Sequence, residues 1–373
     1  MKLDLGKKLG FGCMRLPVVN GETTNIDDVQ FSKMIDTFLA QGFRYFDTAY
    51  PYHNEQSEAA VRRCLVERYD RDAFYLADKM PVWLVKETAD FERIFATQQE
   101  RCGVEYFDFY LLHALNAERI AELEQNGGFD FLKELKASGR AKHIGFSFHD
   151  SAAVLEKTLA AHPEVDFVQL QINYYDWDSK EVQSGLCYEV ATRHGVPVIV
   201  MEPIKGGTLA NLAPKAAEIL QKQNPDVTLA SYAVRYAASL DNVMMVLSGM
   251  SNLSQLEDNT SYMKDFAPLT MQEKKAIEQV VVELHKLPTI ACTGCRYCVA
   301  GCPKQILIPD LFGAYNKTVQ FGNNDVTRRS YVQAVGDNHG KPSDCIRCGK
   351  CEGQCPQHLP IRELLTDVAK TFE

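Results

Sequence analysis

The sequence predicts an α/β chain in which a (β/α)8 barrel of the TIM class is followed by a small, mainly α-helical domain. Three observations lead to this prediction. Eight short apolar runs alternate with amphipathic, helix-like stretches over about the first 265 residues. The apolar runs are nearly continuous, as expected for strands that are covered on both faces. Eight of the 12 cysteines fall within the last 82 of the 373 residues, which sets that segment apart.

The predicted strands are rich in Val, Ile, Leu, Phe and Tyr and are bounded by turn or helix signals. They are Gly10–Met14, Arg44–Asp47, Phe74–Lys79, Phe107–His113, His143–Ser147, Phe167–Ile172, Pro197–Met201 and Val243–Leu247. The predicted helices between and after them are Ile26–Gln41, Glu55–Arg68, Asp90–Cys102, Phe129–Ser138, Ser151–Ala161, Lys180–His194, Thr228–Ala238 and Leu253–Met263. Two more helices are expected over 270–287 and Ile308–Val319. We therefore expect a barrel over 1–265, a helical linker over 266–290 and a second domain over 291–373.

A doubly wound open sheet is the alternative to the barrel. That fold calls for a Gly-rich phosphate-binding fingerprint directly after the first strand. The stretch at this point reads LGFGCMRLP and lacks the G-x-G-x-x-G spacing. The pattern therefore favours the barrel.

Charge and composition narrow the class of function. The net charge is −9, and residues 292–373 carry 10 Lys and Arg against 8 Asp and Glu, which leaves 30 against 41 for residues 1–291. An acidic barrel argues against binding of nucleic acid, which needs Lys and Arg to neutralise phosphates. No apolar run approaches the roughly 20 residues that span a bilayer, and the polar start of the chain lacks a signal core. We expect a cytoplasmic protein, in which clustered Cys indicate metal or redox centres rather than disulfides.

Two cysteine runs near the end of the chain have the same spacing, C-x2-C-x2-C-x3-C-P. They are Cys292, Cys295, Cys298 and Cys302, and Cys345, Cys348, Cys351 and Cys355. This is the iron–sulfur run of bacterial two-cluster ferredoxins, in which the fourth Cys of each run ligates the other cluster. One [4Fe-4S] cluster is then expected on Cys292, Cys295, Cys298 and Cys355, and the other on Cys345, Cys348, Cys351 and Cys302. A pair of structural zinc sites is the alternative, but zinc motifs usually consist of C-x2-C pairs. The 42 residues between the runs resemble helical ferredoxin-like modules that are appended to larger oxidoreductases.

Polar side chains end three neighbouring strands of the predicted barrel. The second strand ends in Asp47, with Tyr52 in the loop after it, the third ends in Lys79 and the fourth in His113. Active sites of such barrels lie at the carboxyl ends of the strands, so these four side chains should share one rim. A Lys ammonium beside a Tyr favours the phenolate and so strengthens the phenol as a proton donor. Asp47 would keep Lys79 charged, and His113 could orient a substrate carbonyl.

Several stretches of the chain resemble the aldo/keto reductase family over about residues 1–265. They are LGFGCMRLP, FDTAYPYHNEQSE, LADKMP, YFDFYLLHAL, HIGFSFHD, FVQLQINYYD, VMEPIKGG and SGMSNLSQLEDN. The resemblance implies that Tyr52 is the general acid, with Asp47, Lys79 and His113 in the roles given above. It also implies hydride transfer from NADPH bound across the rim. Ser147 and Gln169 match the residues that hold the nicotinamide carboxamide. The segment around the adenine ribose and its 2′-phosphate is matched by Gly249, Ser251, Gln255, Asp258 and Asn259.

The sequence departs from the family pattern at four places. Phe148 and Met201 replace an Asn and a Tyr that many members carry beside the nicotinamide. Gln255 replaces an Arg of many NADPH-preferring members, and the loss of that Arg weakens the case for a 2′-phosphate partner. NADP remains the family expectation, and NAD stays open. Asp78, directly before Lys79, either retunes the ion pair or points away from it.

Three functions remain open at this stage. The protein is a carbonyl reductase whose clusters are structural or regulatory, or its clusters exchange electrons with a ferredoxin or flavoprotein partner, or it is a nicotinamide-binding redox sensor. The complete acid–base set argues against the sensor. Trp83 and Trp177 fall in predicted rim loops, where aromatic side chains often line substrate pockets, although loop packing is the alternative. The rim loops hold no cluster of Arg, so a phosphorylated substrate is not expected.

Overall fold

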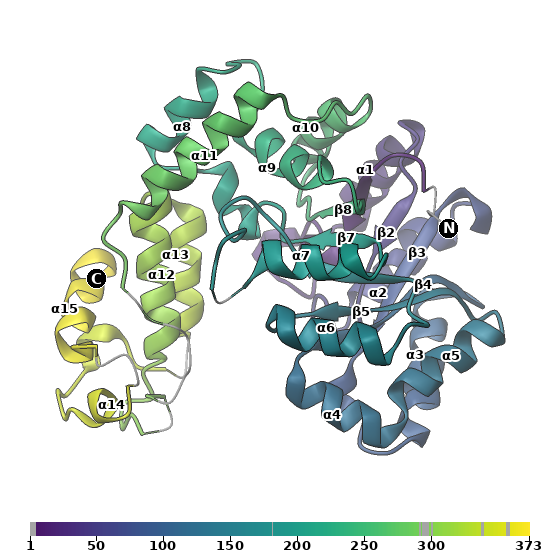
Figure 1. Cartoon of the computed structure of the whole chain (residues 1–373), viewed down its shortest axis with the longest axis horizontal. Coiled ribbons are helices and arrows are strands. Elements are labelled where there is room, and N and C mark those ends of the chain that lie inside the picture. The colour runs from purple at the N-terminus through teal and green to yellow at the C-terminus, as the bar shows by residue number, and fades with distance from the viewer. Residues whose placement is uncertain are drawn as a thin grey trace. The chain divides into compact units, whose positions relative to one another are not determined.

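The computed structural model describes residues 5–180, 182–290, 292, 298–299, 301–336, 339–355 and 359–373 (Figure 1). The chain forms two compact units. The first consists of Met1–Ile204 and Ser231–Leu269, and the second of Lys205–Ala230 and Thr270–Glu373. The structure thus divides the chain differently from the expected boundaries, because 205–230 and most of the expected linker belong to the second unit.

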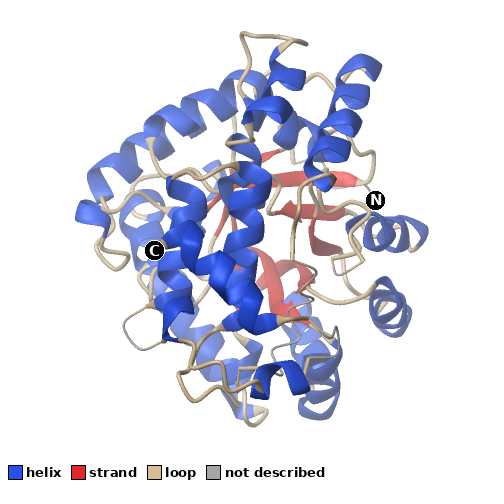
Figure 2. Ribbon diagram, turned by 90° about the vertical axis from the view of Figure 1, so that its left-hand side faces the viewer, coloured by secondary structure: helices blue, strands red, loops and turns tan. Residues whose placement is uncertain are grey.

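The first unit contains a closed barrel of eight parallel strands that follow one another in chain order. The strands are β1 (Leu9–Gly12), β2 (Tyr45–Asp47), β3 (Tyr75–Met80), β4 (Phe107–Leu115), β5 (Ala141–Phe148), β6 (Phe167–Gln171), β7 (Val198–Met201) and β8 (Val243–Ser248). Each strand pairs with the next, and β8 pairs with β1. The predicted barrel is confirmed, with strand ends shifted by one or two residues in most cases. Figure 2 shows the strands in red, with helices around them.

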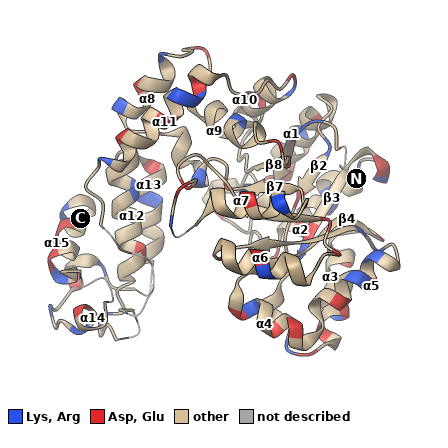
Figure 3. Ribbon diagram, in the orientation of Figure 1, with Lys and Arg blue, Asp and Glu red and all other residues tan. Residues whose placement is uncertain are grey.

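Helices of the first unit cover the outside of the barrel. They are α1 (Asp28–Ala40), α2 (Ser57–Val61), α3 (Ala89–Cys102), α4 (Ala117–Asn126), α5 (Gly128–Ala137), α6 (Ala152–Ala161), α7 (Ser184–Arg193), α9 (Leu229–Ala238) and α10 (Leu253–Met263). Among these helices only α4 had no counterpart in the sequence prediction, and Leu123 is its single buried residue. Lys and Arg are interspersed with Asp and Glu along α4 to α6 (Figure 3).

The alternation of side chains along the strands decides which residues reach the inside of the barrel. Its apolar interior includes one residue from each of the strands β2, β3, β4, β6 and β7, namely Tyr45, Ala77, Phe109, Phe167 and Ile199. A second apolar layer lies between the strands and the helices. Residues two positions beyond an interior residue also point inward, toward the carboxyl end of the barrel. The predicted site residues Asp47, Lys79 and Gln169 have this placement, and His113 lies four positions beyond Phe109.

The second unit is built from helices within its described residues (Figure 2). They are α8 (Pro214–Gln221), α11 (Met271–His285), α12 (Ile308–Phe321), α13 (Asp325–Val335), α14 (Lys350–Gly353) and α15 (Ile361–Phe372), with a short helical turn over Lys205–Ala210. Helix α8 packs against α11, which explains why both segments belong to this unit. The core of its cysteine-rich part combines Leu311, Phe312, Leu365 and Val368 with several Cys side chains. None of the described helices is long and apolar enough to cross a membrane.

Candidate functional site

Lys79 joins three of its neighbours at the carboxyl mouth of the barrel. Its side chain is fully buried. Its ammonium nitrogen donates to Asp47 Oδ1 at 2.5 Å, to the carbonyl oxygen of Thr48 at 2.6 Å and to the hydroxyl oxygen of Tyr52 at 3.3 Å. These three bonds match the three protons of an ammonium group. The structure therefore brings Asp47, Tyr52 and Lys79 together as the sequence predicted.

The loop that carries Tyr52 is held in an unusual backbone conformation. Its next three residues, His53, Asn54 and Glu55, have φ values of 53°, 50° and 68°. Such values cost about 1–3 kcal/mol each outside glycine, so the surrounding contacts must hold the loop in place. The imidazole of His53 supplies two of these contacts, because it accepts from the Leu16 N–H at 2.9 Å and contacts the Thr23 carbonyl at 2.8 Å.

His113 lies at an irregularity in strand β4, where its pairing with β5 is shifted. The pairing of β4 with β5 shifts between Leu112 and Leu115, and Ala114 adopts a φ of 58°. The Ala114 N–H that this irregularity frees donates to Ser147 Oγ at 2.7 Å. Bulges of this kind re-aim side chains next to active sites. The His113 ring lies 6.1 Å from that of Tyr52, centre to centre, and its buried Nδ1 has no hydrogen-bond partner among the described residues.

The electrostatics of the mouth set the charge of each group. Burial acts to lower the pKa of Lys79, but Asp47 and Tyr52 outweigh it and raise that pKa, so the ammonium stays charged. Burial raises the pKa of Tyr52, and the Lys79 ammonium opposes this effect. Burial, followed by the charge of Lys79, holds the pKa of His113 well below its usual value. The mouth therefore presents a neutral imidazole and a protonated phenol beside a fixed cation.

Asp78 points away from this group, into the layer between barrel and helices. Its Oδ1 accepts from the Lys79 N–H at 2.8 Å, and its Oδ2 lies 3.7 Å from the Cys102 sulfur. Burial and then the nearby Glu58 carboxyl raise its pKa well above the usual range. On the same side, Gln98 Nε2 donates to Glu58 Oε1 at 3.1 Å and to the Lys79 carbonyl at 3.0 Å. The side chains of Asp78 and Gln98 thus satisfy both backbone groups of Lys79, a role that no motif in the sequence indicates.

The two residues expected to hold a nicotinamide carboxamide lie side by side. Ser147 on β5 and Gln169 on β6 are paired in register, and both are buried. Gln169 Nε2 donates to Asp47 Oδ2 at 3.2 Å, which adds this residue to the group around Lys79. Ser147 accepts from Ala114 and keeps its hydroxyl proton available. A hydroxyl donor beside an amide oxygen suits the acceptor and the donor of a carboxamide, so these residues fit the group.

The residues expected around the adenine ribose lie between β8 and the first turns of α10. Gly249 and Ser251 are in the connection, and Gln255, Asp258 and Asn259 are on the helix. Gln255 is exposed, and its Oε1 accepts from the Ser251 N–H at 2.7 Å. The amide of Asn259 is occupied within the fold, since its Oδ1 accepts from Ser248 and Tyr262. Arg15 was not among the residues that the sequence placed near the adenine ribose. Its side chain lies against Gly249 and forms an ion pair with Glu202 at 3.5 Å.

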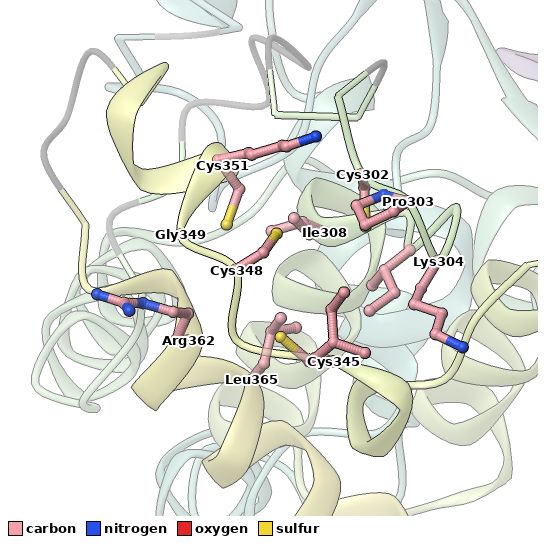
Figure 4. A pocket seen from close by; sticks show the side chains of 13 residues that line it. Cys302, Pro303, Lys304, Ile308, Cys345, Cys348, Gly349, Cys351, Arg362 and Leu365 are labelled. Carbon is pink, nitrogen blue, oxygen red and sulfur yellow. The ribbon is translucent and has the colours of Figure 1, made fainter.

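Four cysteines from the two separate runs line one pocket of the second unit. Cys302, Cys345, Cys348 and Cys351 surround a volume of about 350 Å³, which includes space open to solvent. Figure 4 shows their sulfur atoms around this space, with Lys304 and Arg362 at its sides. The set is the one that interleaved ligation requires for one cluster, and the donor chemistry of four thiols fits a [4Fe-4S] group.

The other predicted set is described only in part. Cys298 belongs to the apolar core of the unit, and Cys292 and Cys355 pack against that core. Cys295 lies outside the described residues. The four cysteines of the barrel, Cys13, Cys64, Cys102 and Cys187, are buried free thiols, and burial raises the pKa of each of them.

The fold and the group around Lys79 define a barrel oxidoreductase with an appended cysteine-rich domain. The aldo/keto reductase family model matches residues 8–282, and a 4Fe-4S dicluster domain model matches residues 291–359. The chain therefore belongs to the aldo/keto reductase family.

Curated relatives agree with this assignment, and solved structures share the fold. An aldo-keto reductase of Mycolicibacterium smegmatis is 26% identical over 270 residues, covering 68% of this chain and 92% of that protein. A 9,11-endoperoxide prostaglandin H2 reductase of Trypanosoma cruzi is 23% identical and covers 68% and 83%. Among solved structures, a holo-form aldo-keto reductase from Bacillus halodurans superposes with a TM-score of 0.58 at 22% identity, covering 73% of this chain and 91% of that chain. An aldo-keto reductase from Klebsiella pneumoniae in complex with NADPH gives 0.59 at 17% identity, with coverage of 74% and 90%.

Proposed function

We propose that the protein reduces the carbonyl group of a small molecule with NADPH, and that Tyr52 is the general acid. The observation that carries this proposal is the Lys79 ammonium, which donates at once to Asp47, Thr48 and Tyr52 inside the barrel mouth. Reduction of a carbonyl leaves negative charge on its oxygen, and a proton donor must neutralise that charge. The Tyr52 hydroxyl supplies this proton, and the adjacent cation stabilises the phenolate that remains.

The neutral His113 acts as a hydrogen-bond donor to the carbonyl oxygen. An imidazolium would compete with Tyr52 as the acid, and the low pKa of His113 removes that competition. Asp47 keeps the cation in place and is itself fixed by Gln169. These residues therefore polarise the carbonyl and control the proton.

NADPH, when bound, supplies the hydride. Ser147 and Gln169 would hold its carboxamide, and Gly249, Ser251, Gln255 and Asp258 would lie along its adenosine part. The NADPH complex of the Klebsiella pneumoniae protein supports this choice of nucleotide.

The second unit is proposed to hold two [4Fe-4S] clusters with interleaved ligands. Cys302, Cys345, Cys348 and Cys351 would hold one of them, and their shared pocket supports this set. The remaining cluster would take Cys292, Cys295, Cys298 and Cys355.

Electron exchange with a ferredoxin or flavoprotein is a second candidate function for these clusters. One observation favours it, because Cys348 is exposed at the pocket. The nearby Ile346 is also exposed, with 58% of its surface open to solvent. A cluster at this position would lie within reach of a partner's redox group.

The Tyr52→Phe variant tests the proposed reductase. We expect NADPH-dependent reduction of an aldehyde to fall by about 100-fold or more, while nucleotide binding is retained. Unchanged turnover would refute the role of Tyr52. Anaerobic titration with NADPH, followed optically, shows whether electrons reach the clusters.

A further inference from the structure

We propose that Arg119 binds the carboxylate of the substrate, so that the reductase acts on small carbonyl compounds that carry an acid group. The subsite consists of Trp83, His113 and Arg119. The inference rests on the proposed function and names its substrate class.

A series of ring contacts leads from the predicted acid to Arg119. The rings of Tyr52 and His113 lie 6.1 Å apart, and those of His113 and Trp83 lie 5.2 Å apart. The guanidinium carbon of Arg119 lies 5.3 Å from the centre of the Trp83 ring. The indole therefore contacts both the imidazole of His113 and the guanidinium of Arg119. A substrate whose carbonyl lies at Tyr52 and His113 would extend along Trp83 toward Arg119.

The fold holds Arg119 in position next to His113. Arg119 lies in the first turn of α4, where its backbone N–H is capped by the Asn116 side chain at 2.9 Å. One guanidinium nitrogen donates to the carbonyl of Ala114 at 2.6 Å. Ala114 directly follows His113 at the irregularity in β4. The remaining guanidinium protons form a planar fork, which matches the two oxygens of a carboxylate.

Arg119 has no acidic partner within ion-pair distance among the residues that the structure describes. Arg119 is half-buried, as are Arg71 and Arg101. In contrast to Arg119, Arg71 pairs with Asp108 at 2.6 Å and Arg101 pairs with Glu58 at 3.1 Å. A guanidinium keeps its charge at any pH of interest and needs a counter-ion when it is partly desolvated. A bound carboxylate would supply that counter-ion.

His113, the neighbour of this subsite, indicates that a ligand binds in the mouth of the barrel. Its Nδ1 is buried without a hydrogen-bond partner in the described part of the chain, and such groups are rare unless a ligand or water completes them. Burial lowers the pKa of His113, and Lys79, His149 and Arg119 add to the effect. Lys79 and Arg119, the two permanent charges that act on this imidazole, are both positive, which favours an anionic ligand near His113.

The test compares a charged aldehyde with a neutral one of nearly the same size, 4-carboxybenzaldehyde and its methyl ester, methyl 4-formylbenzoate. Their kcat/KM values are measured with the full chain, purified anaerobically, and NADPH. We expect the acid to be preferred at least tenfold at low ionic strength, mainly through KM, and the preference to shrink with salt. Arg119→Gln should lower the acid-to-ester ratio at least tenfold, and Arg119→Lys should lower it less. Arg93→Gln, which removes an exposed Arg paired with Asp90 on α3, is the matched control and should leave the ratio unchanged.

A binding measurement separates failure of this subsite from failure of the reductase. In a Trp177→Phe background Trp83 is the only tryptophan, and benzoate should quench its fluorescence saturably. Arg119→Gln should abolish that quenching. Equal use of the two aldehydes, or a ratio that Arg119→Gln does not change, would overturn the subsite and leave the reductase intact. Benzoate binding that depends on Arg119, without turnover of either aldehyde, would support the subsite and refute the proposed reaction. If the parent chain neither reduced the aldehydes nor bound benzoate, the subsite would be refuted.

Discussion

The ammonium nitrogen of Lys79 lies 3.3 Å from the hydroxyl oxygen of Tyr52, and the same nitrogen contacts Asp47 at 2.5 Å. The Lys79 side chain has no exposure to solvent, so Asp47 rather than water stabilises its positive charge. The same ammonium group acts on the hydroxyl of Tyr52. The ion pair thus has one structural and one chemical role, and variants can separate the two.

Lys79→Met should destabilise the barrel and abolish reduction. Loss of the cation leaves the buried Asp47 carboxylate unpaired, and breaking a buried pair in this way costs about 3–5 kcal/mol. The double variant Asp47→Asn with Lys79→Met should recover most of that stability and stay inactive, because Tyr52 has lost its cation. Urea unfolding followed by tryptophan fluorescence measures the first unit, which contains both Trp83 and Trp177. Full activity of the double variant would contradict the role given to Lys79.

Asp78→Asn should stabilise the barrel at neutral pH. Burial and then Glu58 raise the pKa of Asp78 in the folded chain, whereas the unfolded chain has an ordinary Asp near pKa 3.9. The stability that comes with the protonated form is therefore complete below about pH 4 and is lost as the pH rises through the folded pKa. Asn keeps the acceptor for the Lys79 N–H without this titration. The urea concentration at the midpoint of unfolding is measured between pH 5 and 9. It should fall less steeply with pH for the variant than for the parent chain. The same pH dependence in both chains would argue against a raised pKa of Asp78.

The sequence predicted the barrel and the group around Lys79 because both follow from local rules. Continuous apolar runs define the strands, and a polar residue at a strand end reaches the mouth, so Asp47, Lys79 and His113 could be identified one at a time. The contacts of Ser147 and Arg119 with Ala114 depend on a shift in the pairing of two strands, and no spacing in the sequence encodes that shift. Helix α13 was not predicted because it buries only Thr327 and Ala334, and α14 was not predicted because it is four residues long with no buried residue. Helix α15 was missed although its buried residues follow helical spacing, namely Ile361, Leu365, Val368 and Phe372.

Replacement of single cysteines should distinguish interleaved from sequential ligation. Cys302→Ser and Cys345→Ser should remove the same cluster, because both thiols line one pocket, and Cys298→Ser should remove the other. Each variant is expected to keep about four of about eight iron atoms per chain. Iron and sulfide analysis gives the count, and electron paramagnetic resonance of the reduced protein identifies the signal that is lost. If Cys302→Ser and Cys298→Ser removed the same signal, each run would hold its own cluster.

Gln255→Arg should increase the preference for NADPH over NADH. Gln255 is exposed in the first turn of α10, beside the connection expected to follow the adenine ribose, and its side chain now accepts from the Ser251 N–H. An Arg at this position offers a planar fork to a 2′-phosphate, which Gln lacks. The NADPH-to-NADH ratio of kcat/KM should rise by about tenfold, mostly through the KM for NADPH, and added salt should reduce the gain. Gln255→Glu is the matched control and should shift the ratio the other way, because its carboxylate repels the phosphate. If neither variant changes the ratio, the adenine ribose does not lie beside Gln255, and the cofactor assignment along α10 is wrong.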